Sequence, residues 1–242
     1  MNPADPKNPE LIDAMRQDAA LQSLAMRLFN RACDYRYSYN FTWLGIPIIQ
    51  FPQDIVAVQE LIWSVQPDVI IETGVAHGGS LILSASILQL LGGDRFVIGI
   101  DVDIRRHNRE RLEHHPLASR LRLIEGSSTS PELVAQVREL VGETRKTMVF
   151  LDSNHTHDHV LKELELYSPF VRKGSYLVVF DTVIEQMPVG SFPNRDWDIG
   201  NSPLTAVREF LARNRRFEID KEIHSKLLLT VAPDGYLKCI GD

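Results

Sequence analysis

The sequence predicts an α/β protein with a mostly parallel sheet. Short runs of aliphatic and β-branched residues alternate with longer amphipathic segments, a pattern typical of strand–helix units in a parallel sheet. Four of the short runs lead into a carboxylate, at Glu72, Asp101, Asp152 and Asp181. The final stretch, residues 217–240, contains the turn signal Pro-Asp-Gly, which predicts an antiparallel hairpin at the edge of the sheet.

Composition sets the class of protein and its partners. With 242 residues, 44% hydrophobic and 24% charged, the chain resembles an ordinary globular protein that can bury a sizeable core. A net charge of −6 leaves no basic excess to bind nucleic acid or an anionic membrane. No run reaches membrane-spanning length, no secretory signal opens the chain, and its two cysteines are far apart. We therefore expect a cytoplasmic protein that binds neither nucleic acid nor a membrane.

The first part of the chain predicts an extension, residues 1–50, packed on a core domain formed by residues 51–242. Residues 9–36 have a loose apolar stripe at helical spacing, which favours self-association of the protein into a homo-oligomer. Residues 35–45 are unusually aromatic. Aromatic side chains at this density either pack the extension onto the core or line a pocket.

The core elements follow one another in strict alternation. Pro52 and Asp54 open a helix, as expected for a proline and an acidic residue in its first turn, and Pro67 ends it. Buried strands begin at Val69, Phe96, Leu121, Met148 and Tyr176, and helices occupy residues 81–91, 105–114, 131–141 and 160–171, with a last helix from Pro203. Residues 183–202 have no period, and a loop of this length is more often functional than idle.

Residues 69–80 are the predicted centre of the site, because a buried strand runs into a glycine-containing turn and a helix. Ligands of open α/β sheets bind at the carboxyl ends of strands, where the strand order reverses. Gly74, Gly78 and Gly79 do not fit the G-x-G-x-x-G spacing of a dinucleotide site. S-adenosylmethionine has no phosphates and relaxes this requirement, so it is the preferred cofactor.

Particular residues suit the parts of this cofactor. Asp101 can accept hydrogen bonds from both ribose hydroxyls, although it could instead cap the helix that follows. Glu72 offers a carboxylate to the cationic end, and Ser127 or Ser128 can bond near the adenine edge. The complete set of predicted cofactor contacts is Glu72, Thr73, Gly74, His77, Ser80, Asp101, Val102, Ser127, Ser128 and Asp152.

Several separated motifs resemble one known family. They lie at residues 43–45, 50–59, 71–74, 99–103, 151–155, 181–182, 206–211 and 227–238. Together they resemble the cephalosporin hydroxylase family over residues 35–240. The resemblance implies the Rossmann-like methyltransferase fold and S-adenosylmethionine-dependent O-methyltransferase activity, which in that family acts on cephalosporins and rhamnosyl groups. We therefore expect methylation of a hydroxyl on a small molecule or sugar.

The fourth and fifth strands supply the predicted chemistry. Their carboxylates, Asp152 and Asp181, should converge at one edge of the sheet and suit Mg²⁺, which could hold and acidify the acceptor hydroxyl. Resemblance to metal-dependent catechol-type O-methyltransferases adds Thr182 as a ligand and His155 as the base, so Asp152 and His155 are the predicted catalytic residues. The cephalosporin hydroxylase family commonly has a glutamate where this chain has Phe180. The third ligand could then be Thr182, Glu185 or water, and the remaining alternative is that no metal binds tightly.

Other interpretations are weaker. The spacing His155-x-His157-x-His159 suggests zinc, but a helix beginning near residue 157 would point alternate side chains about 200° apart, which makes His157 and His159 surface or capping residues. A nicotinamide-dependent oxidoreductase conflicts with the glycine spacing. A non-catalytic relic of the fold has only Phe180 in its favour, and no facial triad for non-haem iron is visible. The acceptor itself is not identified, although Trp197 and the aromatic stretch could line its pocket.

Overall fold

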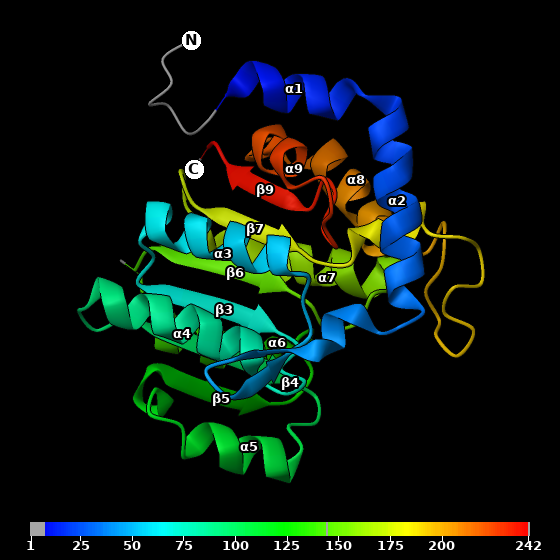
Figure 1. Cartoon of the computed structure of the whole chain (residues 1–242). Coiled ribbons are helices and arrows are strands. Elements are labelled where there is room, and N and C mark those ends of the chain that lie inside the picture. The colour runs from blue at the N-terminus through cyan, green and yellow to red at the C-terminus, as the bar shows by residue number, and fades with distance from the viewer. Residues whose placement is uncertain (1–7, 144, 242) are drawn as a thin grey trace.

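One sheet carries the predicted α/β architecture. The computed structural model describes residues 8–143 and 145–241, and in it seven strands form a sheet with the order β5-β4-β3-β6-β7-β9-β8 (Figure 1). The strands are β3 (Val69–Thr73), β4 (Phe96–Asp101), β5 (Leu121–Glu125), β6 (Thr147–Leu151), β7 (Tyr176–Val179), β8 (Phe217–Ile219) and β9 (Tyr236–Cys239). The first five are parallel, and β9 is antiparallel to both of its neighbours. The predicted Rossmann-like sheet with an antiparallel C-terminal edge is confirmed.

The strand order reverses between β3 and β6. From β3 the chain moves outward through β4 to β5, and then returns to place β6 on the other side of β3. Thr73 at the end of β3 pairs with Ile100 of β4 and Leu151 of β6. The loops that leave β3 and β6 therefore start side by side, which is the position where open α/β sheets bind ligands.

Helices cover both faces of the sheet (Figure 1). The helices of the core are α3 (Pro52–Val65), α4 (Gly79–Leu91), α5 (Arg106–Glu113), α6 (Pro131–Val141), α7 (His157–Tyr167), α8 (Pro203–Arg213) and α9 (Lys221–Leu227), with short 3₁₀ turns η2 (Ala118–Arg120), η3 (Ser168–Phe170) and η4 (Thr182–Gln186). Side chains alternate between two apolar clusters, so Ile70 packs with α3 and α4 while Ile71 packs with α6 and α7. Within the described residues, no helix is long and apolar enough to cross a membrane.

The N-terminal segment contains two helices where the sequence suggested one helical stretch. These are α1 (Pro9–Gln17) and α2 (Ala19–Cys33), followed by η1 (Tyr37–Asn40) and a hairpin of β1 (Phe41–Trp43) and β2 (Ile46–Ile48). The break falls at Asp18, whose carboxylate accepts a hydrogen bond from the amide of Leu21 at 2.9 Å and so caps α2.

This segment packs tightly on the start of α4. A Cβ atom at Gly79 would lie 2.3 Å from the carbonyl oxygen of Pro47, and the indole of Trp43 donates to Ser86 at 3.0 Å. Of the aromatic stretch, Tyr37 packs against Phe51, so packing on the core accounts for part of it. The predicted domain boundary at residue 50 stays a prediction, and residues 1–7 of that extension lie outside the described part of the chain.

The C-terminal edge is joined to α3 by a buried carboxylate. Asp54 is fully buried in the first turn of α3 and accepts hydrogen bonds from Thr230, from the amide of Val231 at 2.9 Å and from Tyr236 at 2.8 Å. The antiparallel strands β8 and β9 are connected by α9 and a loop, not by a tight turn at residues 233–235. The helix α9 was not predicted from the sequence. Three consecutive leucines begin at its last residue, Leu227, and a run of this kind is typical of a strand.

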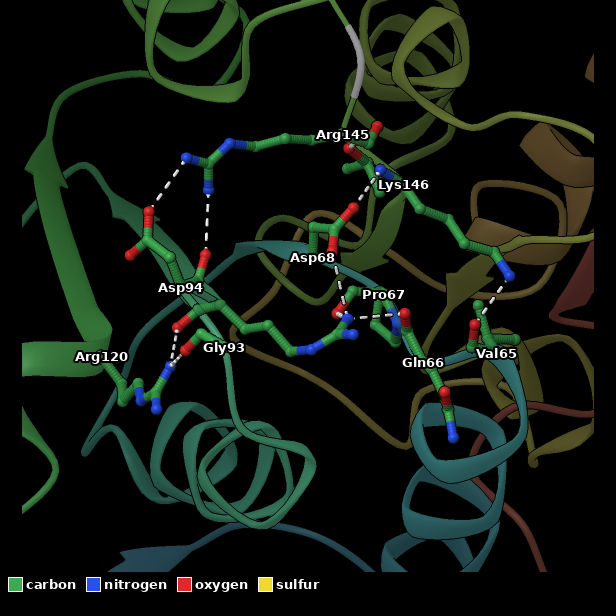
Figure 2. Close-up of polar contacts among 11 residues, drawn as sticks. Val65, Gln66, Pro67, Asp68, Gly93, Asp94, Arg120, Arg145 and Lys146 are labelled. Carbon is green, nitrogen blue, oxygen red and sulfur yellow. Dashed lines mark hydrogen bonds and ion pairs between the residues drawn. The ribbon is translucent and has the colours of Figure 1, made fainter.

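The amino-terminal edge of the sheet is closed by basic side chains that bind loop oxygens (Figure 2). Lys146 donates to the carbonyl of Val65 at 2.7 Å, and Arg145 donates to the carbonyl and the carboxylate of Asp94 at 3.2 Å. Asp68 accepts from the backbone amide of Lys146 at 2.9 Å. These contacts fasten the loops at this edge to one another, so the opposite, carboxyl edge is the one that presents uncommitted groups.

Candidate active site at the carboxyl edge

A cavity lies where the strand order reverses. It is lined by Pro47, Ile49, Gln50, Gly74, Val75, Ala76, His77, Gly78, Gly79, Ser80 and Asp152. The structure thus brings together four predicted residues, Gly74, His77, Ser80 and Asp152. Gln50 was missed by the sequence reasoning: it is buried, and its side-chain oxygen has no hydrogen-bond partner. It begins one of the stretches that carry the family resemblance, but its place at the cavity could not be predicted, because the packing of β2 on α4 brings it there.

Glu72 lies beneath the cavity on the α4 side of β3. The side chain is 2% exposed. One carboxylate oxygen accepts a hydrogen bond from Ser80, and the other is buried without a partner. Burial raises the pKa of Glu72 to about 8, the Ser80 hydroxyl opposes this rise, and the charge of Asp152 adds to it. An unpartnered buried carboxylate oxygen is a site for a cation.

Thr73 points to the opposite face of β3. It is fully buried, its hydroxyl has no partner, and it does not line the cavity. Its carbonyl accepts from the amide of Asp152 at 2.9 Å. The Thr73 side chain is therefore not among the groups that line the cavity, and the residue positions the end of β6.

Gly74 is needed for a different contact from the one expected. Its φ is +90°, and a Cβ atom there would lie 1.9 Å from the carbonyl oxygen of Asp152. The missing side chain therefore admits the backbone that follows β6, whereas the sequence reasoning assigned that space to a ligand. Any side chain at this position would force apart the two loops that form the site.

Asp101 holds the loop that follows β3. One of its oxygens accepts from the amides of Val75 at 2.8 Å and Ala76 at 3.3 Å, and the other accepts from the amide of Asp103 at 3.1 Å. The helix that follows begins at Arg106 and is not capped by Asp101. Each carboxylate oxygen has a further lone pair, so Asp101 can still accept bonds from a ligand. Val102 beside it is 75% exposed and offers an apolar surface.

The two serines after β5 differ in accessibility. Ser127 is exposed, and its hydroxyl is 2.9 Å from that of Thr129. Ser128 is buried, its hydroxyl lies 3.2 Å from His159, and its carbonyl accepts from Tyr167. Of the two alternatives for the adenine edge, Ser127 is the one whose hydroxyl reaches the surface.

A second group of side chains forms beside the cavity. Asp152 and His155 lie in the loop after β6, and Asp181 follows β7. One potential ligand atom from each lies within 4.8 Å of the others. The His155 ring nitrogens are 3.5 Å from Asp152 and 3.2 Å from Asp181. Thr182 does not complete this group, because its buried hydroxyl donates to the carbonyl of Pro233 at 2.6 Å. His155 takes the place that was predicted for Thr182.

The charges in this group act on one another. Burial alone would lower the pKa of His155, but Asp181, Asp152 and Glu163 reverse this effect and raise it. Burial also raises the pKa of Asp181, which His155 partly offsets. Asp181 has a left-handed backbone with φ 54°, a conformation that aspartate tolerates and that often marks functional sites.

The long loop between η4 and α8 closes over this group. Glu185 is not a metal ligand, because its carboxylate accepts from Ser202 at 2.5 Å and from the amide of Gly200 at 3.1 Å. It fastens the ends of the loop together. Trp197 of the loop packs on the His155 ring with 4.8 Å between centroids, and its indole N–H is buried without a partner.

The other two histidines do not converge on a metal. His157 contacts Thr205 at 2.8 Å and Glu209 at 3.3 Å, both on α8. His159 lies between Ser128, Ser153 and Glu163 on the other side of α7. The expectation that they are surface or capping residues is wrong, since both are partly buried and join elements together.

Comparison with known proteins places this site in a family. The family model for Rhamnosyl O-methyltransferase/CmcI matches residues 35–240. The chain belongs to this family. The resemblance inferred from the sequence is confirmed, and with it the prediction that the protein is an O-methyltransferase. The nicotinamide-dependent alternative finds no support.

Relatives and solved structures agree with this placement. Rhamnosyl O-methyltransferase of Mycobacterium tuberculosis (strain H37Rv) is 31% identical over 230 residues, 89% of either chain, and that of Mycobacterium leprae is 30% identical over 201 residues, 81% of this chain and 82% of the other. A structure described as cmcI-D160 Mg-SAM aligns with a TM-score of 0.59 at 18% identity, covering 84% of this chain and 78% of the other. The O-methyltransferase TomG from Streptomyces achromogenes, in complex with SAM, aligns at 0.55 and 19%, covering 93% and 92%.

We predict that Glu72→Gln removes a pH-dependent part of the stability. The folded pKa of about 8 lies above the ordinary 4.5, so the stabilisation is present below the ordinary value and lost as the pH rises through the folded one. Between about pH 5 and about pH 9 the free energy of unfolding of the ligand-free variant should therefore fall by about 4 kcal/mol less than that of the original protein. Urea unfolding at several pH values measures this. Glu139→Gln on the exposed face of α6 is the matched control, and parallel curves for Glu72→Gln and the original protein would contradict the assignment.

Proposed function

We propose that this protein transfers a methyl group from S-adenosylmethionine to a hydroxyl of a sugar or natural product. The observation that carries the proposal is the pair of carboxylates at the reversal of strand order. Glu72 has a buried carboxylate oxygen without a hydrogen-bond partner. The carboxylate of Asp101 accepts a hydrogen bond from the amide of Val75 in the loop that follows β3. This arrangement suits a ligand with a cationic amino-acid end and a ribose, and the family supplies the reaction type.

The donor would be held by residues from three strands. Glu72 would face its ammonium group, Asp101 its ribose hydroxyls, and Val102 and Ser127 its adenine. His77 and Ser80 border the same cavity. When bound, S-adenosylmethionine supplies a methyl group on a sulfonium. The chain's part is to orient that methyl group toward the acceptor and to exclude water.

The acceptor oxygen would be held at Asp152, His155 and Asp181. The mixed carboxylate and imidazole group fits a divalent cation, because the donor atoms already lie close together and the Nε2 atom of His155 is buried without a hydrogen bond. A bound ion of the Mg²⁺ type supplies positive charge that lowers the pKa of the acceptor hydroxyl. The description Mg-SAM of a structure with the same fold is consistent with such a pair of cofactors.

We predict that cofactor binding depends on Asp101. Saturating S-adenosylhomocysteine, about a hundredfold above its Kd, should raise the melting temperature by about 5–10 °C. Asp101→Asn should lose most of this shift. The side-chain amide replaces one carboxylate oxygen with an NH₂ group, which cannot accept hydrogen bonds from the loop amides or from the ribose hydroxyls. Asp103→Asn, exposed two residues later, is the control. If the original protein shows no shift at saturating ligand, the proposed function fails.

We further propose that the loop of residues 183–202 forms the acceptor pocket and that the acceptor is a carbohydrate. The curated relatives are named rhamnosyl O-methyltransferases, and Trp197 sits on His155 with a free indole donor. An indole face packs well on the C–H face of a sugar ring.

Replacing Trp197 tests the acceptor pocket. Trp197→Ala should lower kcat/KM for a rhamnoside acceptor by about tenfold and leave the melting shift with S-adenosylhomocysteine unchanged. Trp197→Phe should retain most of the activity, and Trp63→Ala, on the exposed side of α3, should behave like the original protein. An unchanged kcat/KM in Trp197→Ala would remove this residue from the pocket.

We also infer that copies of the chain associate through the N-terminal helices. Leu24 and Leu28 stand one turn apart on α2 and are 54% and 57% exposed, and such apolar pairs favour burial. In sedimentation, the double variant Leu24→Glu, Leu28→Glu should have a lower mass than the original protein, whereas Leu90→Glu should not. A monomeric original protein would contradict the inference. A cytoplasmic location stays a prediction from the sequence, which cell fractionation can test.

A further inference from the structure

The residue before Asp181 is part of the core in this chain. Phe180 is 5% exposed and packs edge-on against Phe150 with 6.1 Å between ring centroids. It joins the apolar cluster beneath α3 and α4. Phe180 therefore offers no ligand, and the group that could hold an ion combines the carboxylates of Asp152 and Asp181 with His155.

His155 stands where a third donor is needed. Its ring lies between the two carboxylates, 3.2 Å from Asp181 and 3.5 Å from Asp152. These two distances start from different ring nitrogens, Nδ1 and Nε2. One potential donor atom from each of the three residues lies within 4.8 Å of the others. Neighbouring ligands on an octahedral ion with bonds near 2.1 Å are about 3 Å apart, so a small adjustment would bring all three donors onto one ion.

The surroundings hold His155 in this position. It shares a loop with Asp152, and that loop is fixed by the contact between Gly74 and the Asp152 carbonyl. Trp197 covers one side of the ring. With one ring nitrogen on an ion, the other can keep its contact with a carboxylate, as is usual for histidines that bind metals.

We propose that His155 is a metal ligand, and that this nitrogen-containing site prefers Mn²⁺ and Co²⁺ to Mg²⁺. Imidazole suits the transition ions, whereas Mg²⁺ favours oxygen ligands and retained waters. The affinity of a mixed nitrogen and oxygen site rises from Mn²⁺ toward Co²⁺. The inference rests on the proposed function, because the ion would hold the acceptor. It concerns only the atoms that bind the ion, so metal binding can be measured without catalytic turnover.

The test begins with the metal alone. Purified protein is freed of metal with EDTA and titrated calorimetrically with Mg²⁺, Mn²⁺ and Co²⁺. Pulsed EPR of the Mn²⁺ complex should show coupling to a directly bound nitrogen in the original protein and none in His155→Asp. In that variant, whose set is all carboxylate, the preference for Co²⁺ over Mg²⁺ should fall by about tenfold or more. His114→Asp, at the exposed end of α5, should keep both the coupling and the preference.

The outcomes separate the two proposals. Absence of nitrogen coupling in the original protein, or an equal metal preference in His155→Asp, overturns the role of His155. So does a failure to bind any of the three ions. If S-adenosylhomocysteine still raises the melting temperature in those cases, the proposed function stands without this ligand set. Should His155→Asp not fold, the EPR spectrum of the original protein decides alone.

Discussion

The site depends on negative charge kept out of water at the carboxyl edge of the sheet. Asp54, Glu72, Asp152 and Asp181 gather there, and burial raises the pKa of Asp54 and Asp181, and of Glu72 to about 8. Asp152 contributes to all three shifts. Buried carboxylates without counter-charges destabilise a fold, so this edge is favourable only when cations or protons accompany it. In the proposed reaction a cationic donor and a divalent ion would supply positive charge in addition to that of His155.

Asp152 links the two halves of the proposed reaction. It lines the cavity that would hold the donor and belongs to the group that would hold the acceptor. Its carbonyl fits against Gly74, and its amide bonds to Thr73. The two loops cannot shift independently, because the strands they leave are paired and their backbones touch. Donor and acceptor sites are therefore held in one fixed relation, which methyl transfer requires.

Local sequence was enough to predict the strands and the carboxylates that follow them. A buried strand has a recognisable run of residues, and parallel strands bring their ends to one edge, so Glu72, Asp101 and Asp152 could be placed together. The direction of a side chain in a loop was not predictable in the same way. Thr182 turns to Pro233, and His155 turns inward, because of contacts with segments remote in sequence. Gln50 reaches the cavity through packing that leaves no local signal.

Phe180 departs from the glutamate that the family resemblance implies, and this suggests loss of function when the sequence is considered alone. The structure gives the change a different meaning, because the phenylalanine fills the core at the same edge where His155 comes between Asp152 and Asp181. A decayed site would have no reason to keep two carboxylates buried beside a histidine at a cost in stability. Because the chain keeps these buried groups despite the loss of stability, we infer that they still bind a ligand. In the proposed metal site the third donor comes from the loop after β6, and the donor set combines oxygen with nitrogen.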